Sequence, residues 1–304
     1  MKARFLATTL LAAAGVVSCS IAFAQPFPTR PVRMVVPTSA GSGSDILARL
    51  LGKGLSERWG QPVVVENKPG ASGTIGIDLV AKSEGDGYMM VLVANNYATV
   101  PSLYQLTYDP LRDLAPVCQV ALGGMVLVVN PAIPAHTVAE LVALAKKEPG
   151  RMSYGSAGPG STHHMMMELF KQVAGIDVVH VPYKGPNAMY PDLLNNRIST
   201  AFIASNAAVT YVPDGKFRAL AVAGNKRLDS FPSVPTVAEA GYKAFDPELW
   251  YGLFAQGTTA KDVVHKVSRD AQAVLASAEV KASLEKLGLE SARLVRETGI
   301  KGQQ

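Results

Sequence analysis

Two segments rich in glycine and serine carry the residue types that bind an anion through the backbone. The first is 38–45 and the second is 155–164, and each follows a short apolar run and precedes an amphipathic one. Glycine lets a backbone approach a ligand closely, and the free amides at a helix start attract negative charge. The pattern predicts two anion-binding loops, each joining a strand to a helix.

Neither loop has the residues that other chemistries need. Both lack the lysine of a phosphate loop and the G-x-G-x-x-G pattern, and 155–158 does not match a G-x-S-x-G nucleophile elbow. The neighbouring residues His163 and His164 precede three methionines. Adjacent positions on a helix diverge by about 100°, so these histidines cannot bind one ion together. We therefore expect no catalytic centre, no metal and no cofactor.

Two other polar turns also follow predicted strands. These are 95–99 and 183–185, and the second contains Lys184, which is either a counter-charge for a ligand or a solvated loop residue. In open α/β sheets, ligands bind beyond the carboxyl ends of the strands. All four loops are therefore expected to border one site.

The first 24 residues have the pattern of a secretory signal. Lys2 and Arg4 precede the apolar stretch 5–17, which is short for a membrane span, and 22–24 reads Ala-Phe-Ala. This pattern predicts export and cleavage after Ala24. A retained membrane anchor is an alternative, and so is lipidation of Cys19, because 16–19 resembles a lipoprotein cleavage box.

Charge and cysteine content exclude several classes of protein. Loss of the signal lowers the net charge from +5 to about +3, and the basic residues are scattered, which argues against a nucleic-acid surface. Cys118 is then the remaining cysteine, so no intramolecular disulfide is expected. Its strand-like surroundings indicate a small buried apolar residue.

Strands that alternate with helices predict an α/β fold, and the chain length favours two domains. No proline- or serine-rich linker is present, so the chain is expected to pass between the lobes more than once. The expected strands are 32–36, 63–66, 90–93, 117–121, 125–129, 153–154, 177–180, 200–203, 219–223 and 251–255. The expected helices are 45–58, 73–82, 138–147, 161–173, 187–195, 237–240, 260–276 and 277–288.

Many sequence blocks, in order, give the chain a family resemblance. They include Phe27-Pro28-Thr29-Arg30-Pro31, Gly60-Gln61-Pro62-Val63-Val64-Val65-Glu66-Asn67-Lys68-Pro69-Gly70-Ala71, Gly85-Asp86-Gly87-Tyr88, His180-Val181-Pro182-Tyr183-Lys184-Gly185 and Pro235-Thr236-Val237-Ala238-Glu239-Ala240-Gly241. Over 27–289 the chain resembles the Bug proteins, the periplasmic solute-binding components of tripartite tricarboxylate transporters.

The resemblance implies a two-lobed, periplasmic-binding-protein-like (flytrap) fold with mixed, mainly parallel sheets and a cleft between the lobes. Domain 1 is expected to comprise 25–124 and 228–304, and domain 2 to comprise 125–227. The implied protein is a periplasmic monomer that captures a small carboxylate and delivers it to a membrane permease. An exported sensor that feeds a membrane signalling protein and an exported enzyme are the alternatives.

The family's contacts fall on the four loops already described. The predicted ligand-binding residues are Ser39, Gly41, Ser42, Asp45, Asn95, Thr99, Ser156, Gly158, Ser161, Thr162, His164 and Tyr183. Asp45 also has a purely structural interpretation, because an acid in the first turn of a helix complements its dipole.

The sequence departs from the family pattern in three places. The loop 38–42 lacks the usual aromatic residue and two prolines, and 203–206 lacks an acid that could bind a ligand amine, which favours a plain carboxylate. The family's terminal helix is not recognisable beyond Gly288. We therefore expect 296–304 to be disordered, the first sheet to lose apolar cover, and domain 1 to be the less stable lobe.

Overall fold

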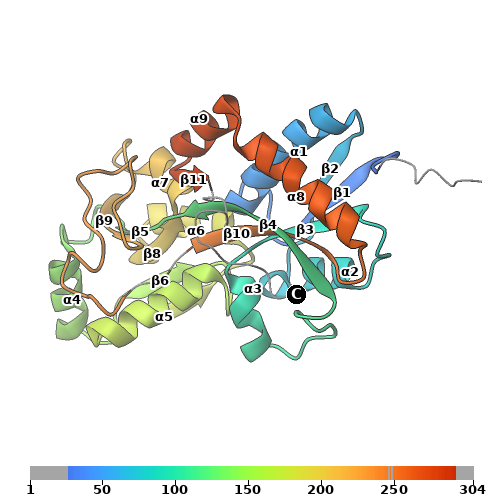
Figure 1. Ribbon diagram of the computed structural model, residues 1–304. Helices are drawn as coiled ribbons and strands as arrows, with labels where there is room; N and C mark the ends of the chain where they lie inside the picture. The colour runs from blue at the N-terminus through green and yellow to red at the C-terminus, as the bar shows by residue number, and fades with distance from the viewer. Residues whose placement is uncertain (1–26, 246, 248, 292–304) are drawn as a thin grey trace, which may run out of the picture.

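The computed structural model describes residues 27–245, 247 and 249–291, which form two lobes, each built on one β-sheet (Figure 1). We call the six-stranded sheet with its helices lobe 1 and the five-stranded sheet with its helices lobe 2. The sheet of lobe 1 has the order β11-β4-β10-β3-β1-β2. Its strands are β1 (Val32–Val36), β2 (Val63–Asn67), β3 (Met89–Ala94), β4 (Leu114–Gly123), β10 (Leu249–Gln256) and β11 (Leu289–Ser291).

The sheet of lobe 2 has the order β7-β6-β8-β5-β9. Its strands are β5 (Met125–Val129), β6 (Ser153–Ser156), β7 (Val179–Pro182), β8 (Thr200–Ala204) and β9 (Arg218–Ala223). Both sheets are mixed. The strands that enter a lobe from the other one, β5 and β10, pair antiparallel with both of their neighbours, whereas β1 and β6 pair parallel with both of theirs. The mixed α/β, two-lobed fold expected from the sequence is thus confirmed.

Helices cover both sheets. In lobe 1, α8 packs on β4 and beside α1, and α2 packs on β1, β3 and β10 (Figure 1). In lobe 2, α5 and α6 both pack on β6 and β8. The helices are α1 (Gly43–Trp59), α2 (Thr74–Ala81), α3 (Asn96–Thr99), α4 (Val138–Lys147), α5 (Thr162–Ala174), α6 (Pro186–Leu194), α7 (Ser205–Tyr211), α8 (Lys261–Leu275) and α9 (Ala278–Lys286), with 3-10 turns η1 (Ala71–Gly73) and η2 (Val100–Ser102).

The two helices that follow the glycine-rich loops are capped by serine. Ser42 accepts a hydrogen bond from the amide of Asp45 at the start of α1, and Ser161 accepts one from the amide of His164 at the start of α5. Each helix ends at a glycine in the left-handed conformation, Gly60 at φ 64° and Gly175 at φ 64°. Helix α1 therefore begins two residues before the predicted start at Asp45, because Ser42 is the cap.

The chain passes between the sheets twice. Gly124 alone separates β4 from β5, and the segment after β9 leads back to β10. The strands of lobe 1 lie within 25–124 and 228–304, and those of lobe 2 lie within 125–227. The domain boundaries themselves stay a prediction.

One sequence-based expectation near the C-terminus needs correction, and one strand there was not predicted. Residues 237–240 form a turn rather than a helix, because the amide of Val237 donates to Val222 in β9 and Gly241 ends the turn at φ 106°. Beyond Gly288 the chain continues as β11, which pairs antiparallel with β4 and adds an edge strand to the sheet of lobe 1. The preceding helix α9 lies where the apolar spacing predicted it. The predicted disorder of 296–304 lies outside the described residues.

Cys118 lies in β4 and packs against the main apolar core. Burial raises the pKa of its thiol to about 12, so the group stays protonated at neutral pH. This environment agrees with the expected role of an unreactive packing residue.

Candidate ligand-binding cleft

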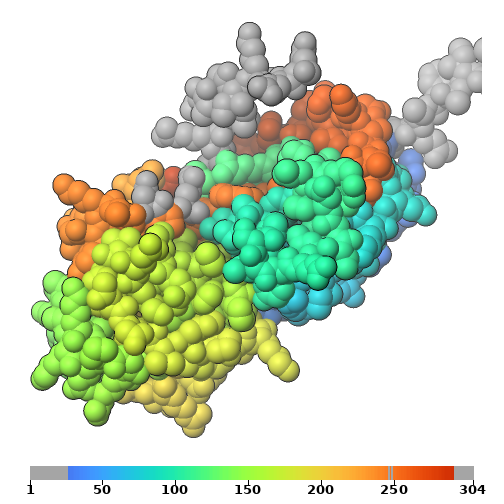
Figure 2. Space-filling model, turned by 90° about the horizontal axis from the view of Figure 1, so that it is seen from below, coloured from blue at the N-terminus to red at the C-terminus, as the bar shows by residue number. Residues whose placement is uncertain are grey.

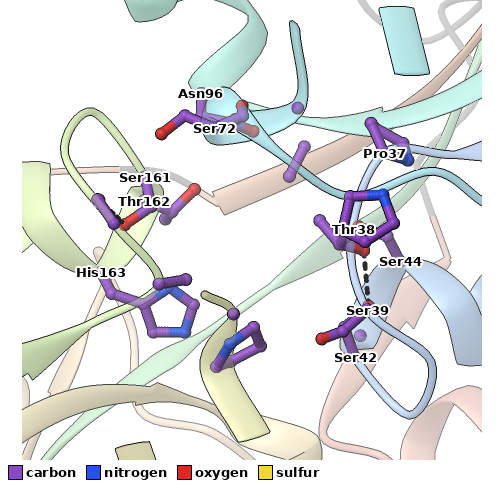
Figure 3. Close-up of a pocket in the computed structure, with 18 of the residues that line it drawn as sticks. Pro37, Thr38, Ser39, Ser42, Ser44, Ser72, Asn96, Ser161, Thr162 and His163 are labelled. Carbon is purple, nitrogen blue, oxygen red and sulfur yellow. Dashed lines mark hydrogen bonds between the residues drawn. The ribbon is translucent and has the colours of Figure 1, made fainter. Parts of the chain in front are cut away.

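A cavity of about 490 Å³ lies between the two lobes. Lobe 1 contributes the loop between β1 and α1, the turn η1 and the start of α3, and lobe 2 contributes the loop between β6 and α5 and the turn after β7. These are strand-to-helix connections, the positions that α/β sheets use for ligands. Figure 3 shows polar side chains that face the cavity from three directions: Ser161, Thr162 and His163; Ser39, Ser42 and Ser44; and Ser72 and Asn96.

The loop of lobe 1 is held by its own polar groups. The hydroxyl groups of Thr38 and Ser42 are 2.6 Å apart, and the amide of Gly41 donates to Oδ2 of Asp45 at 2.8 Å (Figure 3 shows the first bond). Ser42 also donates its own amide to the carbonyl of Ser39. The amide of Gly41 is therefore already satisfied and is not available to a ligand.

Asp45 acts as the internal anchor of this loop. Its side chain is buried, and besides Gly41 it binds Arg49 at 2.9 Å and the amide group of Asn67 at 2.9 Å. Burial alone would raise the pKa of the carboxyl group, but the hydrogen bonds from Arg49, Gly41 and Asn67 outweigh burial and leave the pKa lowered. Asp45 stays ionised, neutralised by Arg49, and does not line the cavity.

The loop of lobe 2 is organised in the same way. Gly158 donates its amide to Oγ of Ser156 at 3.0 Å, and Gly160 donates its amide to Nδ1 of His164 at 3.1 Å. The amide of Ser161 donates to the carbonyl of Gly158. The amides of Gly158 and Gly160 therefore stabilise the loop itself and are not available to a ligand.

Unpaired backbone donors remain at the two helix starts. In the described part of the chain, the amides of Gly43 and Ser44 at the start of α1 make no hydrogen bond, and neither do those of Thr162 and His163 at the start of α5. All four residues line the cavity. The first amides of an α-helix have no intrahelical partner and carry the positive end of the dipole. The cavity therefore has two anion-attracting positions, one in each lobe.

Stacked aromatic rings that do not line the cavity support the loop of lobe 2. The ring centroids of His164 and His180 are 4.3 Å apart, and the ring centroid of His180 lies 4.9 Å from that of Tyr154. Nε2 of His180 is 2.7 Å from Oγ of Ser156, which in turn holds Gly158. Burial, reinforced by His164, lowers the pKa of His180 to about 4, so both histidines are neutral supports at pH 7.

Hydrogen bonds between the lobes close the cavity. Ser72 and Tyr104 of lobe 1 both donate to the carbonyl oxygen of Pro159 in lobe 2, the latter at 2.9 Å. Asn187 of lobe 2 donates to the carbonyl oxygen of Ala40 at 2.8 Å. Figure 2 shows the corresponding surfaces in contact, with the teal segment around residue 105 against the yellow-green one around residue 160. The structure is thus a closed form.

The described residues that line the cavity carry almost no charge. Among the described residues that line it, Lys184 is the one ionisable lysine, arginine or carboxylate, and its side chain is exposed. Buried polar atoms without a partner in the described chain include Oγ of Ser39, Oδ1 of Asn206 and both ring nitrogens of His163. Burial lowers the pKa of His163 to about 4, so this ring is also neutral. These residues would therefore recognise a polar ligand through neutral hydrogen-bonding groups and the dipoles of the two helix starts.

The structure divides the residues predicted from sequence into two groups. Those that line the cavity are Ser39, Gly41, Ser42, Gly158, Ser161, Thr162 and Tyr183. Those that do not line the cavity are Asp45, Asn95, Thr99, Ser156 and His164. Asp45, Ser156 and His164 hold the loops, Asn95 accepts a hydrogen bond of 2.8 Å from Thr162 across the lobes, and Thr99 donates to the carbonyl of Asn96.

Sequence reasoning missed several residues of the wall. They are Ser44, Ser72, Asn96, Tyr104, His163, Tyr190, Asn206 and Tyr251. For His163 and Asn96 the error is one position, because the sequence pattern located the correct turn but not which side chain points inward. For Ser72 a usable signal existed, since 69–73 is another Pro/Gly-rich segment after a predicted strand.

The described residues include no cluster of three or more histidines, cysteines or carboxylates placed to hold a metal ion. In the same residues, no helix has both the length and the apolar character needed to cross a bilayer.

A family model described as "Tripartite tricarboxylate transporter family receptor" (TctC) matches residues 47–296. The chain belongs to this family. It is a TctC-family periplasmic solute-binding protein, as the resemblance of its sequence blocks to the Bug proteins indicated. Among its relatives, Protein BugT of Bordetella pertussis is 35% identical over 266 residues, which cover 84% of this chain and 82% of BugT.

Solved structures of TctC-like proteins have the same fold. The periplasmic binding protein BugD is 34% identical with a TM-score of 0.83, over 88% of this chain and 89% of BugD. Rpa4515 of R. palustris, solved with adipate, is 34% identical with a TM-score of 0.84, over 87% and 89% of the two chains. MatC of Rhodopseudomonas palustris, solved with bound malate, is 28% identical with a TM-score of 0.83, over 89% and 92%.

Proposed function

We propose that this TctC-family protein captures a small organic carboxylate in the periplasm and delivers it to a membrane transporter. One observation carries the proposal: the unpaired amides at the starts of α1 and α5 line one cavity from opposite lobes, and the described wall of this cavity contains no carboxylate. A carboxylate supplies the acceptors that these donors lack. The ligands found in Rpa4515 and MatC, adipate and malate, are carboxylates and support the same class here.

The strength of such a site is adequate for reversible capture. A helix start stabilises an anion by roughly 0.3–1 kcal/mol when exposed and up to about 2 kcal/mol when partly buried. Hydrogen bonds to a charged group contribute about 1.5–3 kcal/mol each. Two helix starts and several hydroxyl donors can therefore reach the roughly −8 kcal/mol of a micromolar complex. Closure of the lobes then follows ligand binding by a shift in population.

The ligand does not need an amine. The described wall contains no carboxylate, and Asp45, the nearest acid to the loop of lobe 1, is already paired with Arg49. Among the described residues of the wall, a ligand ammonium group would find only neutral oxygens, such as Oδ1 of Asn206. Burial of an unpaired ammonium group is costly, which disfavours amino acids.

A thermal-shift panel of carboxylates, amino acids and sugars tests the proposal. A ligand at about 100 times its Kd adds roughly 2.7 kcal/mol of stability, or roughly 5–10 °C in Tm for a protein of this size. We expect carboxylates without an amine to raise the Tm. A response to amino acids or sugars alone would contradict the proposal.

Delivery to a transporter is separable from two alternatives. An exported enzyme would convert a bound acid, so incubation with the acids that raise the Tm should return them unchanged. A sensor would bind a membrane signalling protein, so crosslinking in intact cells should instead capture a permease. We also propose a monomer that is cleaved after Ala24, which the mass of the exported protein tests against lipidation at Cys19.

A further inference from the structure

The floor of the cavity, on the side where the chain crosses between the lobes, is apolar. Met125 opens β5 directly after the crossing, and it pairs in register with Ala204 at the end of β8. Leu249 is the first residue of β10. It pairs with Gly123, which precedes Met125 by two residues in the chain. Met125, Ala204 and Leu249 line the cavity together with the rings of Tyr190 and Tyr251. We call these five residues the floor.

The polar groups beside the floor are neutral. Both the hydroxyl of Tyr251 and Oδ1 of Asn206 lie next to Gly43, where a Cβ atom would be 2.6 Å and 3.3 Å from them. Burial raises the pKa of the Tyr251 phenol, so it remains uncharged. No described residue beside the floor supplies a counter-charge, so burial of a second charged group there would be strongly unfavourable.

The cavity is also larger than a four-carbon acid requires. Its volume of about 490 Å³ falls in the range of pockets that enclose drug-sized molecules. At roughly 30 Å³ per water molecule it corresponds to about sixteen waters, more than the nine non-hydrogen atoms of malate would displace. A short acid bound at the helix starts would leave part of the cavity beside the floor unfilled by ligand.

We propose that the ligand is a carboxylate with an uncharged, largely apolar body, which packs on the floor while its carboxylate binds at the helix starts. This inference rests on the proposed function and narrows the ligand class within it. A medium-length aliphatic or an aryl-substituted acid fits these features better than a short hydroxylated diacid. The floor contributes affinity through buried apolar area, and the helix starts contribute charge recognition.

Calorimetric titration with straight-chain acids from propanoate to octanoate tests the proposal on the wild-type protein. Each methylene that becomes buried should raise affinity about fourfold, until the chain reaches the end of the cavity. 3-Phenylpropanoate should bind at least tenfold more tightly than malate. Succinate and malate serve as the short polar reference ligands.

Ala204→Leu adds three carbons to the floor and should shorten the accommodated chain. We expect the rise in affinity to stop at a shorter acid, while the shortest acids bind as before. Ala278→Leu makes the same change on the exposed start of α9, away from the cavity, and should leave the whole series unchanged. Thermal melting without ligand checks that both variants fold, and Ala204→Val is the substitute if Ala204→Leu does not.

The possible outcomes separate the two proposals. Affinity that rises with chain length in the wild-type protein supports the apolar ligand class. Affinity that is independent of length, or malate bound more tightly than 3-phenylpropanoate, overturns this inference and leaves carboxylate capture standing. Failure of every acid in the panel to bind overturns both.

Discussion

The phenol of Tyr104 in lobe 1 donates a hydrogen bond of 2.9 Å to the carbonyl oxygen of Pro159 in lobe 2. Ser72 donates to the same oxygen, and its own carbonyl accepts from Asn96. Ser72 has a left-handed backbone, with φ 53° and ψ 30°, a conformation uncommon for serine. The closed form therefore depends on a turn that the neighbouring side chain of Asn96 holds in position.

Tyr104→Phe should weaken ligand binding about two- to tenfold. The variant loses one hydrogen bond that exists only in the closed form, and such a bond contributes about 0.5–1.5 kcal/mol. The loss should appear mainly as faster ligand dissociation in stopped-flow or surface-plasmon measurements. Tyr88→Phe is the control, because its hydroxyl accepts from the amide of Thr29 within lobe 1. Equal dissociation rates for Tyr104→Phe and the wild type would show that this bond does not hold the lobes together.

Gly41→Val and Gly158→Val should each weaken binding at least tenfold, and more than Lys184→Ala does. Gly41 has φ 76° and a Cβ there would lie 3.1 Å from Asn187, which bonds across the lobes, while Gly158 has φ 110°. A valine at either position strains the loop and displaces the adjacent helix start. Lys184 is exposed at the rim and contributes only a screened charge.

Gly60→Val is the matched control for the glycine variants. Gly60 has φ 64°, but no atom lies within 4 Å of its Cβ position, so it reports backbone strain alone. It should lower stability without changing affinity by calorimetry. Similar affinity losses in all three valine variants would mean that the two loops have no special role in binding.

Asp45→Asn should lower both stability and affinity. The variant removes the charge that pairs with Arg49 and weakens the bond that fixes the amide of Gly41, at a cost of about 1–3 kcal/mol. Asp270→Asn is the comparison, because Asp270 is similarly buried and holds Arg58 and Trp59 far from the cavity. Denaturant unfolding should show a loss for both variants, and calorimetry should show weaker binding for Asp45→Asn alone.

The stability of the protein should fall as the pH decreases from 7 to 5. Burial lowers the folded-state pKa of His163 from 6.5 to about 4, so the unfolded chain binds a proton that the folded one does not. The free energy of unfolding then decreases with falling pH, by at most about 1.4 kcal/mol per pH unit for this one group. His180 shifts in the same direction and adds to the effect.

His163→Phe should flatten this pH dependence, because it removes one titrating group and keeps an aromatic ring. Leu169→Phe, on the same helix, introduces a ring without removing a titrating group and should leave the slope unchanged. Urea unfolding at a series of pH values measures both. An unaltered slope in His163→Phe would show that the ring is not buried in the folded protein.

The sequence was sufficient to predict most strands and helices and the four loops that border the cleft. Apolar spacing along a helix is a local signal, so α1, α4, α5 and α9 could be located from it. Which atoms face the ligand is not a local property. Gly41 and Gly158 were predicted to bind the ligand, but the amide of each donates to a side chain only two to four residues away, Asp45 or Ser156.

The C-terminal region shows a second limit. Leu289–Ser291 is too short for its periodicity to identify it as a strand, and its pairing with β4 depends on a partner about 170 residues earlier in the chain. The floor had no sequence signal for the same reason. Met125, Ala204 and Leu249 become neighbours only because the chain crosses between the sheets at this point.

Three of the hydrogen bonds that join the lobes are accepted by main-chain carbonyls, whereas the bond from Thr162 is accepted by the side chain of Asn95. Tyr104 and Ser72 donate to the carbonyl of Pro159, and Asn187 donates to the carbonyl of Ala40. A carbonyl oxygen persists whatever side chain its residue carries. Mutational drift at 40 and 159 can therefore reshape the rim of the cleft during evolution, while these three bonds between the lobes are kept as long as their donors remain.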